Sequence, residues 1–236
     1  MEAKEFDEAK LHFHKSLNAH PEFKTSQIND KIGDIYFKEE KEWQKAKDYY
    51  LKGLLSAQSF ELQLKVGKCD EKLRDFVSAV ESYKKAADIQ PSNPIAYFRL
   101  GWAHIRNNEK EEGLANLKKS LQLDPNNVDV LTKIAEVMLK DNESLDECIQ
   151  YLKKALEIDP KHADALVIYG RALEKKGDID EAIIYYEKAT NLPNAHINSY
   201  YYLAILYEKR KNFKKSIQLF KQCLSEFNLF SEFCSC

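Results

Sequence analysis

Small residues recur along this chain at a step of 34 or 35 residues, and this period constrains the fold more than any other feature. A branched or aromatic residue precedes each of them, and a second small residue follows about twelve positions later. Such a period is typical of stacked helix pairs, because a single pair cannot bury its own apolar face. The six residues that set the period are Gly33, Gly67, Gly101, Ala135, Gly170 and Ala204.

Within one period the pattern predicts two helices. Tyr97, Leu100, Gly101 and His104 are spaced i, i+3, i+4 and i+7, which places them on one helical face. A second apolar stripe follows and stops at Asp124-Pro125, where proline ends the helix. The small residues are expected where the two helices cross, because a large side chain there would separate the backbones.

These positions resemble the tetratricopeptide repeat (TPR). The segments AYFRLGWAHIRNNEKEEGLANLKKSLQLDP and DALVIYGRALEKKGDIDEAIIYYEKATNLP fit that pattern from end to end. The resemblance implies an all-α TPR solenoid of thirteen helices, with antiparallel pairs stacked in a right-handed superhelix. We expect a half repeat (helix B only) at 1–25, six TPR repeats over 26–230, and a disordered tail at 231–236. The six repeats are predicted at about 26–59, 60–93, 94–127, 128–162, 163–196 and 197–230.

The chain is also similar to the TPR arrays of the general transcriptional corepressor and the related histone demethylase. This similarity lies in the segment SQINDKIGDIYFKEEKEWQKAKDYYLKGL and in the later LGWAH. Another TPR subfamily clamps the C-terminal carboxylate of heat-shock chaperones. Of the five positions that this clamp needs, only Arg99 agrees here, so we do not expect a chaperone clamp. The residues at those positions are Asp30, Asp34, Lys65, Ile95 and Arg99.

Composition and charge restrict the classes of function. The formal charge of −2 provides no general attraction to nucleic acid or membrane, and no apolar run is long enough to span a bilayer. Five cysteines, two of them at small packing positions, argue against a disulfide framework and favour a reducing compartment, cytoplasmic or nuclear. Cys234 and Cys236 have no matching pair for zinc, and the histidines are scattered. We therefore expect neither a metal nor a cofactor.

Catalytic motifs are not found in the sequence. It contains no phosphate-binding loop, nucleotide fingerprint or nucleophile elbow. The chain is therefore predicted not to be an enzyme, but a non-catalytic scaffold for protein–protein interactions. Two alternatives stay open. The chain could be a structural subunit that contacts a larger assembly through its ends and convex face, or the non-catalytic arm of a larger enzyme.

In the TPR family, the first helix of each repeat (helix A) lines a concave groove that holds a partner peptide or helix. Lysine or arginine occupies one inward position in four successive repeats, and repeat 94–127 adds an apolar stripe flanked by arginines. This composition is typical of a binding hot spot for an acidic segment with an apolar anchor. Packing of the aromatics on neighbouring A helices is an equal alternative. The predicted groove residues are Lys31, Lys65, Ile95, Phe98, Arg99, Trp102, Ile105, Arg106 and Lys133.

The two ends of the array are expected to expose apolar surface. The first helix has no helix A to pack against, so the chain either begins within a longer array or pairs with something else. Exposed apolar ends tend to associate, which predicts possible self-association. The residues concerned are Phe6, Phe13 and Leu17 at one end and Leu219, Phe220, Phe227 and Phe230 at the other. A further apolar group, Val167, Ile168, Tyr201, Tyr202 and Ile205, is either a second site or a surface for the next repeat.

Overall fold

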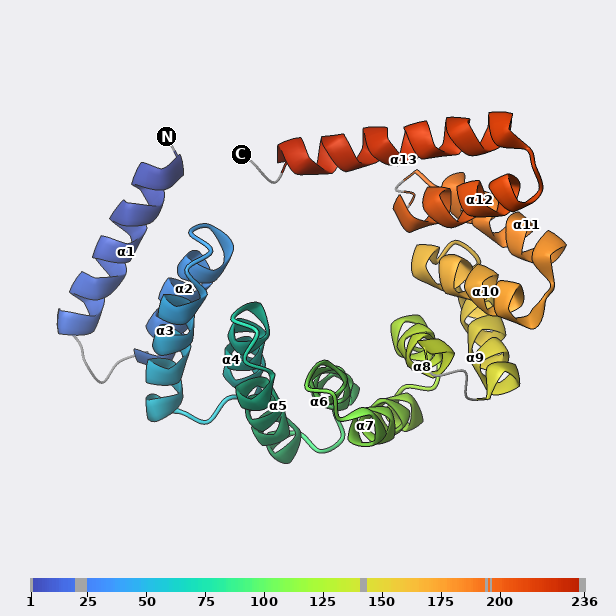
Figure 1. Ribbon diagram of the computed structural model, residues 1–236. Helices are drawn as coiled ribbons and strands as arrows, with labels where there is room; N and C mark the ends of the chain where they lie inside the picture. The colour runs from blue at the N-terminus through green and yellow to red at the C-terminus, as the bar shows by residue number, and fades with distance from the viewer. Residues whose placement is uncertain (1, 20–24, 141–143, 194, 196, 234–236) are drawn as a thin grey trace. The chain divides into compact units, whose positions relative to one another are not determined.

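The computed structural model describes residues 2–19, 25–140, 144–193, 195 and 197–233. All regular structure in this described part is α-helix, in one N-terminal helix and six consecutive pairs, which confirms the predicted TPR architecture (Figure 1). The helices are α1 (Glu2–Ala19), α2 (Thr25–Lys38), α3 (Trp43–Ser56), α4 (Phe60–Lys72), α5 (Phe76–Ile89), α6 (Pro94–Arg106), α7 (Lys110–Leu123), α8 (Val128–Lys140), α9 (Leu145–Ile158), α10 (Ala163–Lys176), α11 (Ile179–Thr190), α12 (Ile197–Lys209) and α13 (Phe213–Phe233).

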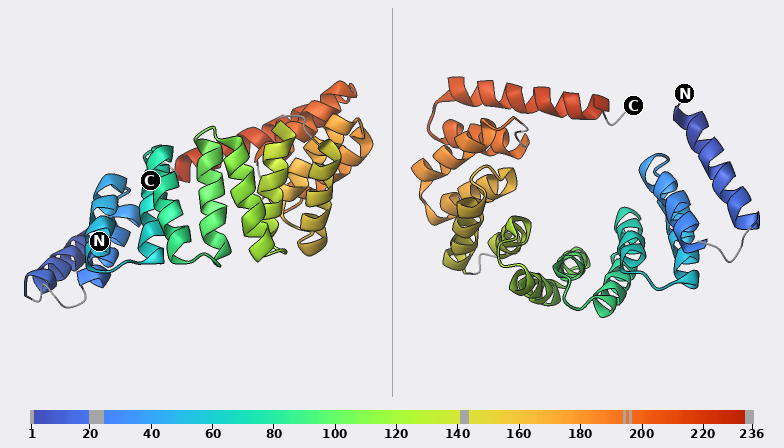
Figure 2. Two further views of the ribbon diagram at one scale, coloured as in Figure 1. Left: turned by 90° about the horizontal axis from the view of Figure 1, so that it is seen from below. Right: turned by 180° about the vertical axis from the view of Figure 1, so that it is seen from behind.

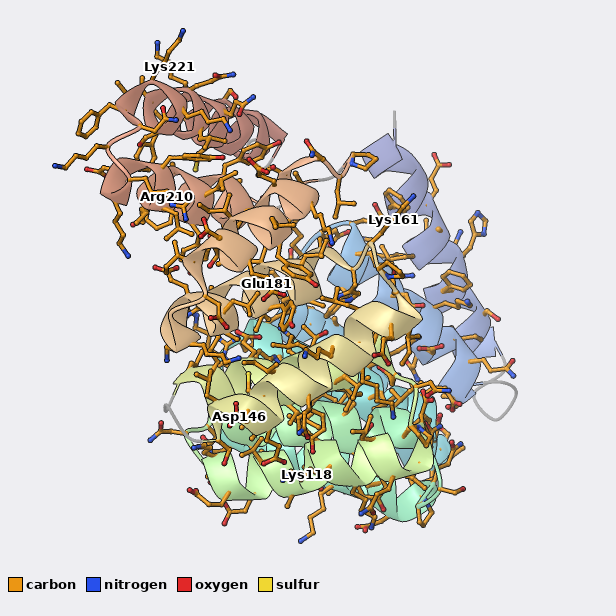
Figure 3. The ribbon with its side chains drawn as sticks, turned by 90° about the vertical axis from the view of Figure 1, so that its right-hand side faces the viewer. Lys118, Asp146, Lys161, Glu181, Arg210 and Lys221 are labelled. Atoms are coloured by element: carbon orange, nitrogen blue, oxygen red, sulfur yellow. The ribbon has the colours of Figure 1, made fainter. Side chains whose placement is uncertain are left out.

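The helices divide into two compact units. Unit 1 spans Met1–Asp124 and holds α1 to α7, and unit 2 spans Pro125–Cys236 and holds α8 to α13. In unit 1, α2, α4 and α6 form one layer and α3, α5 and α7 the other (Figures 1 and 2). The even-numbered helices are thus the A helices of the repeats, and the odd-numbered helices from α3 onward are the B helices. The B helices carry exposed charges of both signs, such as Lys118 on α7, Asp146 on α9, Glu181 on α11 and Lys221 on α13 (Figure 3).

The small residues that set the period lie where helix A meets helix B. A Cβ atom built on Gly33, Gly67 or Gly170 would lie only 2.4, 2.5 or 2.6 Å from the ring of a helix B tyrosine. These rings belong to Tyr50, Tyr83 and Tyr186, all at most 1% exposed. Glycine is therefore required at these crossings, because it alone leaves room for the buried ring.

Side chains at the helix starts satisfy backbone amides that have no partner within the helix. Oγ of Ser59 accepts from the amide of Leu62 at the start of α4, at 3.3 Å. Oδ1 of Asp75 accepts from the amide of Ser78 at the start of α5, at 3.1 Å. Asn93 caps α6 in the same way and is followed by Pro94 in the first turn. Such caps typically contribute about 1 kcal/mol each, so the sequence marks its own helix boundaries.

In every turn from helix A to helix B, one of the described residues has a positive φ. In five of the six pairs this residue is not glycine, although the left-handed conformation disfavours other residues. The sequence pattern does not reveal this feature, because lysine, arginine, asparagine and serine carry it. The six residues are Lys41, Arg74, Asn108, Ser144, Gly177 and Lys211.

At the two ends of the chain, the first helix packs on its neighbour and the last helix is longer than predicted. At the N-terminus, α1 packs on α2, where Lys10 pairs with Glu40 and lies 4.9 Å from the centroid of the Tyr36 ring. At the C-terminus, α13 continues through Phe233 and so includes the first three residues of the disordered tail predicted at 231–236. Residues 234–236, which include both terminal cysteines, lie outside the described residues, as does Pro21.

Candidate functional site

The surface that α2, α4 and α6 turn away from the B helices carries most of the predicted groove residues. We call it the A-helix face of unit 1 and define it by Asp30, Lys65, Lys68, Ile95, Phe98, Arg99 and Trp102. Lys65 and Arg99 come from equivalent positions of successive repeats, as do Lys68 and Trp102, so the 34-residue period itself aligns them. Of the other predicted residues, Lys31 is exposed on α2, and Lys133 belongs to unit 2.

Lys65 is already neutralised by carboxylates of the preceding repeat. Its Nζ atom lies 2.8 Å from Oδ1 of Asp34 and also pairs with Asp30. Burial opposes the ionisation of Asp34, but hydrogen bonds from Lys65 and Tyr50 outweigh it and lower the pKa of this carboxyl group. Lys65 therefore stabilises the packing of α4 on α2, and its charge is less available to a partner than the sequence suggested.

Acidic groups within the described part of unit 1 compensate the charges of Lys68 and Arg99 only in part. Neither makes an ion pair there, and the buried Nε atom of Arg99 has no hydrogen-bond partner among the described residues. Burial, followed by the nearby Arg99 charge, lowers the pKa of Lys68. The two cations thus repel each other on one surface, and an added anion would relieve this repulsion. Sequence reasoning missed Lys68, although it stands at the same helical position as Trp102, one repeat earlier.

Glu71 lies close to these cations and is partly withdrawn from water. Its Oε1 atom is buried without a hydrogen-bond partner among the described residues, and the hydroxyl group of Tyr83 lies nearby. Burial raises the pKa of Glu71 above its ordinary value, and the charge of Arg99 only partly offsets this effect. Glu71 is therefore a weak counter-charge for Lys68 and Arg99.

This burial predicts a pH-dependent effect of Glu71→Gln. When folding raises the pKa of a carboxyl group, ionisation of that group lowers the free energy of unfolding. The loss is absent below the unfolded pKa of about 4.3 and grows as the pH rises. We expect Glu71→Gln to raise the free energy of unfolding modestly at pH 7 and to leave it unchanged near pH 4. Urea unfolding at both pH values measures this difference. The exposed residue Glu81 supplies the matched control, and an equal gain for Glu81→Gln would contradict the argument.

The predicted apolar stripe on α6 is only partly available to a partner. Ile95 is 52% exposed, whereas Phe98 and Trp102 are half-buried. Ile105 was predicted to line the groove, but the structure places it against helix B of its own repeat. A Cβ atom built on Gly113 would lie 2.5 Å from Cδ1 of Ile105, so this side chain fills the space that the glycine leaves.

The arginines beside the stripe differ in their surroundings. The guanidinium carbon of Arg106 lies 4.7 Å from the centroid of the Phe76 ring on α5, and that of Arg99 lies 5.7 Å from the centroid of Phe98. Arg99 therefore borders the aromatic residues of the A-helix face, whereas Arg106 covers the neighbouring repeat. Apart from the paired Lys65, the cationic and apolar residues of the A-helix face are Lys68, Ile95, Phe98, Arg99 and Trp102.

Unit 2 presents a hollow of about 190 Å³ on its own A helices. Val167 and Ile168 are almost fully buried on α10, and the guanidinium carbon of Arg171 lies 5.3 Å from the centroid of the Tyr202 ring. Lys133 is one of its lining residues, and its Nζ atom is 2.9 Å from Oε2 of Glu136. Like Lys65, Lys133 is thus paired within its own unit. The hollow is lined by Lys133, Glu136, Asp164, Val167, Ile168, Arg171, Asn198 and Tyr202.

The described cysteines are not arranged to bind a metal ion. Cys69, Cys148 and Cys223 are free thiols, and no group of three or more histidine, cysteine, aspartate or glutamate residues within the described residues could hold a metal ion. Burial raises the pKa of the Cys148 thiol to about 11, and its Sγ atom donates to the carbonyl oxygen of Ala135 at 3.3 Å. This cysteine behaves as a compact core residue. None of the helices in the described part is long and apolar enough to cross a membrane.

Two family models match the sequence. The model described as the cilia and flagella-associated protein 70 C-terminal domain matches residues 1–196, and a tetratricopeptide repeat model matches residues 198–227. Together they cover the helices from α1 to most of α13. They confirm the predicted repeat family, whereas the further likeness to the corepressor arrays stays a prediction.

Individual proteins match as well. The human peptidyl-prolyl cis-trans isomerase FKBP4 is 32% identical over 149 residues, which are 56% of this chain and 32% of that protein. This chain thus spans about a third of the length of that curated relative. The crystal structure of MamA superposes with a TM-score of 0.61 at 26% identity, covering 80% of this chain and 96% of MamA. The APC/C hetero-tetramer Cut9-Hcn1 superposes with a TM-score of 0.73 at 18% identity, covering 94% of this chain and 43% of that one, which shows a shared fold.

Proposed function

The chain belongs to the family of the cilia and flagella-associated protein 70 C-terminal domain, and from this premise we propose that it is a non-catalytic scaffold that binds a partner protein. The site that we propose is the A-helix face of unit 1. The partner segment is acidic and carries a bulky apolar anchor. Its carboxylates meet Lys68 and Arg99, and its anchor packs against Phe98 and Trp102.

One observation carries this proposal. Lys68 and Arg99 form no ion pair with a described residue, and Glu71 offsets their charges only weakly. By contrast, Lys65 on the same surface pairs with two carboxylates. Cations that repel one another beside half-buried aromatic side chains form a surface whose free energy falls when a carboxylate binds. The aromatic groups then supply the apolar contact that dominates the affinity of most interfaces. The description of the family suggests that the partner is a component of a cilium or flagellum.

The hollow in unit 2 supports a second contact of the same kind. Arg171, which makes no ion pair with a described residue, lies beside the buried side chains of Val167 and Ile168. This arrangement repeats the combination of a cation and an apolar surface found in unit 1. We propose that each unit can hold an acidic segment by itself.

A pull-down distinguishes this function from a purely structural role. Tagged wild-type chain and the variant Lys68→Gln/Arg99→Gln are each incubated with extract of ciliated cells, and the retained proteins are identified. We expect the variant to lose the partners of the A-helix face while its circular dichroism spectrum stays unchanged. Partners retained equally by both proteins would favour the alternative, in which the ends and the B helices make the contacts.

We also propose that the ends of the chain support self-association. Leu11 on α1 is 52% exposed, and Phe213 and Ile217 on α13 are 58% and 55% exposed. Phe6 and Phe13 are half-buried, and Leu17, Phe227 and Phe230 lie among the side chains that are not described. Sedimentation velocity is expected to show dimers or larger species as the concentration rises, and Ile217→Lys should reduce them. A monomer at all concentrations would contradict this expectation.

A further inference from the structure

Unit 2 contains a second hollow, on the other side of its A helices. It has a volume of about 400 Å³ and lies between the B helices α11 and α13, with α12 as its floor. Tyr200 and Tyr207 line it. At 100° per residue these two side chains lie on the opposite side of α12 from Asn198 and Tyr202, which belong to the A-helix hollow. The hollow between α11 and α13 is therefore a separate site.

The charged groups of this hollow neutralise one another. The Nζ atom of Lys215 donates to the hydroxyl oxygen of Tyr207 at 2.7 Å, and that hydroxyl group donates to Oε1 of Glu187 at 2.7 Å. Lys215 and Glu187 are themselves 3.5 Å apart. A charged ligand would have to compete with this closed network. The electrostatics of the wall therefore favour an uncharged ligand.

Three amide side chains in the wall are available to a ligand. Asn191, Gln218 and Gln222 line the hollow, and none of their side chains makes a hydrogen bond with a described residue. Each amide offers both a donor and an acceptor, which is also what the main chain of a peptide offers. Gln218 and Gln222 are four residues apart on α13, about 6 Å along the helix axis. In an extended peptide, the main-chain N–H and C=O groups that point to the same side recur every two residues, at about 6.6 Å.

Apolar contact is provided beneath the amides. Leu203 on α12 is 2% exposed, and Leu219 on α13 is half-buried. We propose that this hollow binds an extended, uncharged polar segment of a partner protein, whose main chain pairs with Gln218 and Gln222 and of which one small apolar side chain rests on Leu219. This site is independent of the A-helix face, so either proposal can fail without the other.

The test uses a phage-displayed library of random dodecapeptides selected on the wild-type chain. Binding of the enriched clones is compared with the variant Gln218→Met/Gln222→Met, which removes the amides at nearly constant size. The matched control is Gln122→Met/Gln150→Met, on exposed glutamines of α7 and α9. We expect a class of clones without charged residues that binds the first variant at least about tenfold more weakly and binds the control as it binds the wild type.

A further comparison separates this site from the A-helix face. The same clones should bind Lys68→Gln/Arg99→Gln as tightly as the wild type. Three results would overturn the proposal. The first is that no uncharged clone is enriched, and the second is that the uncharged clones bind Gln218→Met/Gln222→Met as tightly as the wild type. The third such result is that only charged clones bind this variant more weakly. Because Gln218 and Gln222 are exposed, the variants are expected to fold, and thermal unfolding monitored by circular dichroism checks this.

Discussion

Replacing Ala182 by leucine is expected to lower the free energy of unfolding by about 1–3 kcal/mol. Ala182 is fully buried on α11, close in sequence to Tyr186, whose ring leaves no room for a Cβ atom at Gly170 of α10. Extra methyl groups at such a crossing have to separate the two helices. The same change at Ala79, which is fully buried on α5, should have an effect of similar size.

Ala115 provides the matched control, because it is exposed on α7. Ala115→Leu is expected to change the stability by less than about 0.5 kcal/mol. Urea unfolding followed by circular dichroism compares the midpoints of the variants. If Ala182→Leu and Ala115→Leu shift the midpoint equally, the assignment of small residues to helix crossings is wrong.

The repeat architecture could be predicted because it depends on residues that recur in register. Gly33, Gly67 and Gly170 are each explained by one buried tyrosine, and Pro125 ends a helix where its ring forbids continuation. The left-handed turn residues could not be predicted. Their conformation is imposed by the two helices that they join, and residues such as Arg74 and Lys211 have no local preference for it.

The candidate site was predicted less completely, because it depends on contacts between repeats. The period places Lys65 and Arg99 at equivalent positions, but only the structure shows that Asp30 and Asp34 neutralise the former. Ile105 was expected to line the groove, yet it packs into the space that the missing side chain of Gly113 leaves on helix B. A pattern within one helix cannot reveal how a neighbouring helix uses the same space.

Trp102→Ala is expected to weaken the binding of an acidic segment with an apolar anchor by about 2 kcal/mol, or about 30-fold. Trp102 is half-buried on α6, three residues from Arg99, so its ring can bury an anchor while the guanidinium group meets a carboxylate. Fluorescence anisotropy measures the affinity for a labelled peptide that is rich in aspartate and contains one leucine. Lys68→Gln/Arg99→Gln should mainly slow the association and reduce its dependence on salt.

Trp43 supplies the control for this change. It is also half-buried, but it begins α3, a B helix outside the A-helix face. Trp43→Ala should therefore leave the affinity for the peptide unchanged. If Trp102→Ala unfolds most of the protein while the folded fraction keeps its full affinity, Trp102 is a core residue and the packing interpretation of the aromatic stripe holds.

The most direct test of the proposed binding surface uses Trp102 as its own reporter. The chain contains two tryptophans, so Trp43→Phe leaves Trp102 as the single source of tryptophan fluorescence. This variant is titrated with the aspartate-rich peptide and with a matched peptide that has lysine in place of aspartate. We predict a saturable change in emission with the acidic peptide, which Lys68→Gln/Arg99→Gln reduces, and no change with the basic one. An equal response to both peptides, or no response to the acidic peptide at concentrations where anisotropy shows it bound, would contradict the placement of the partner on this face.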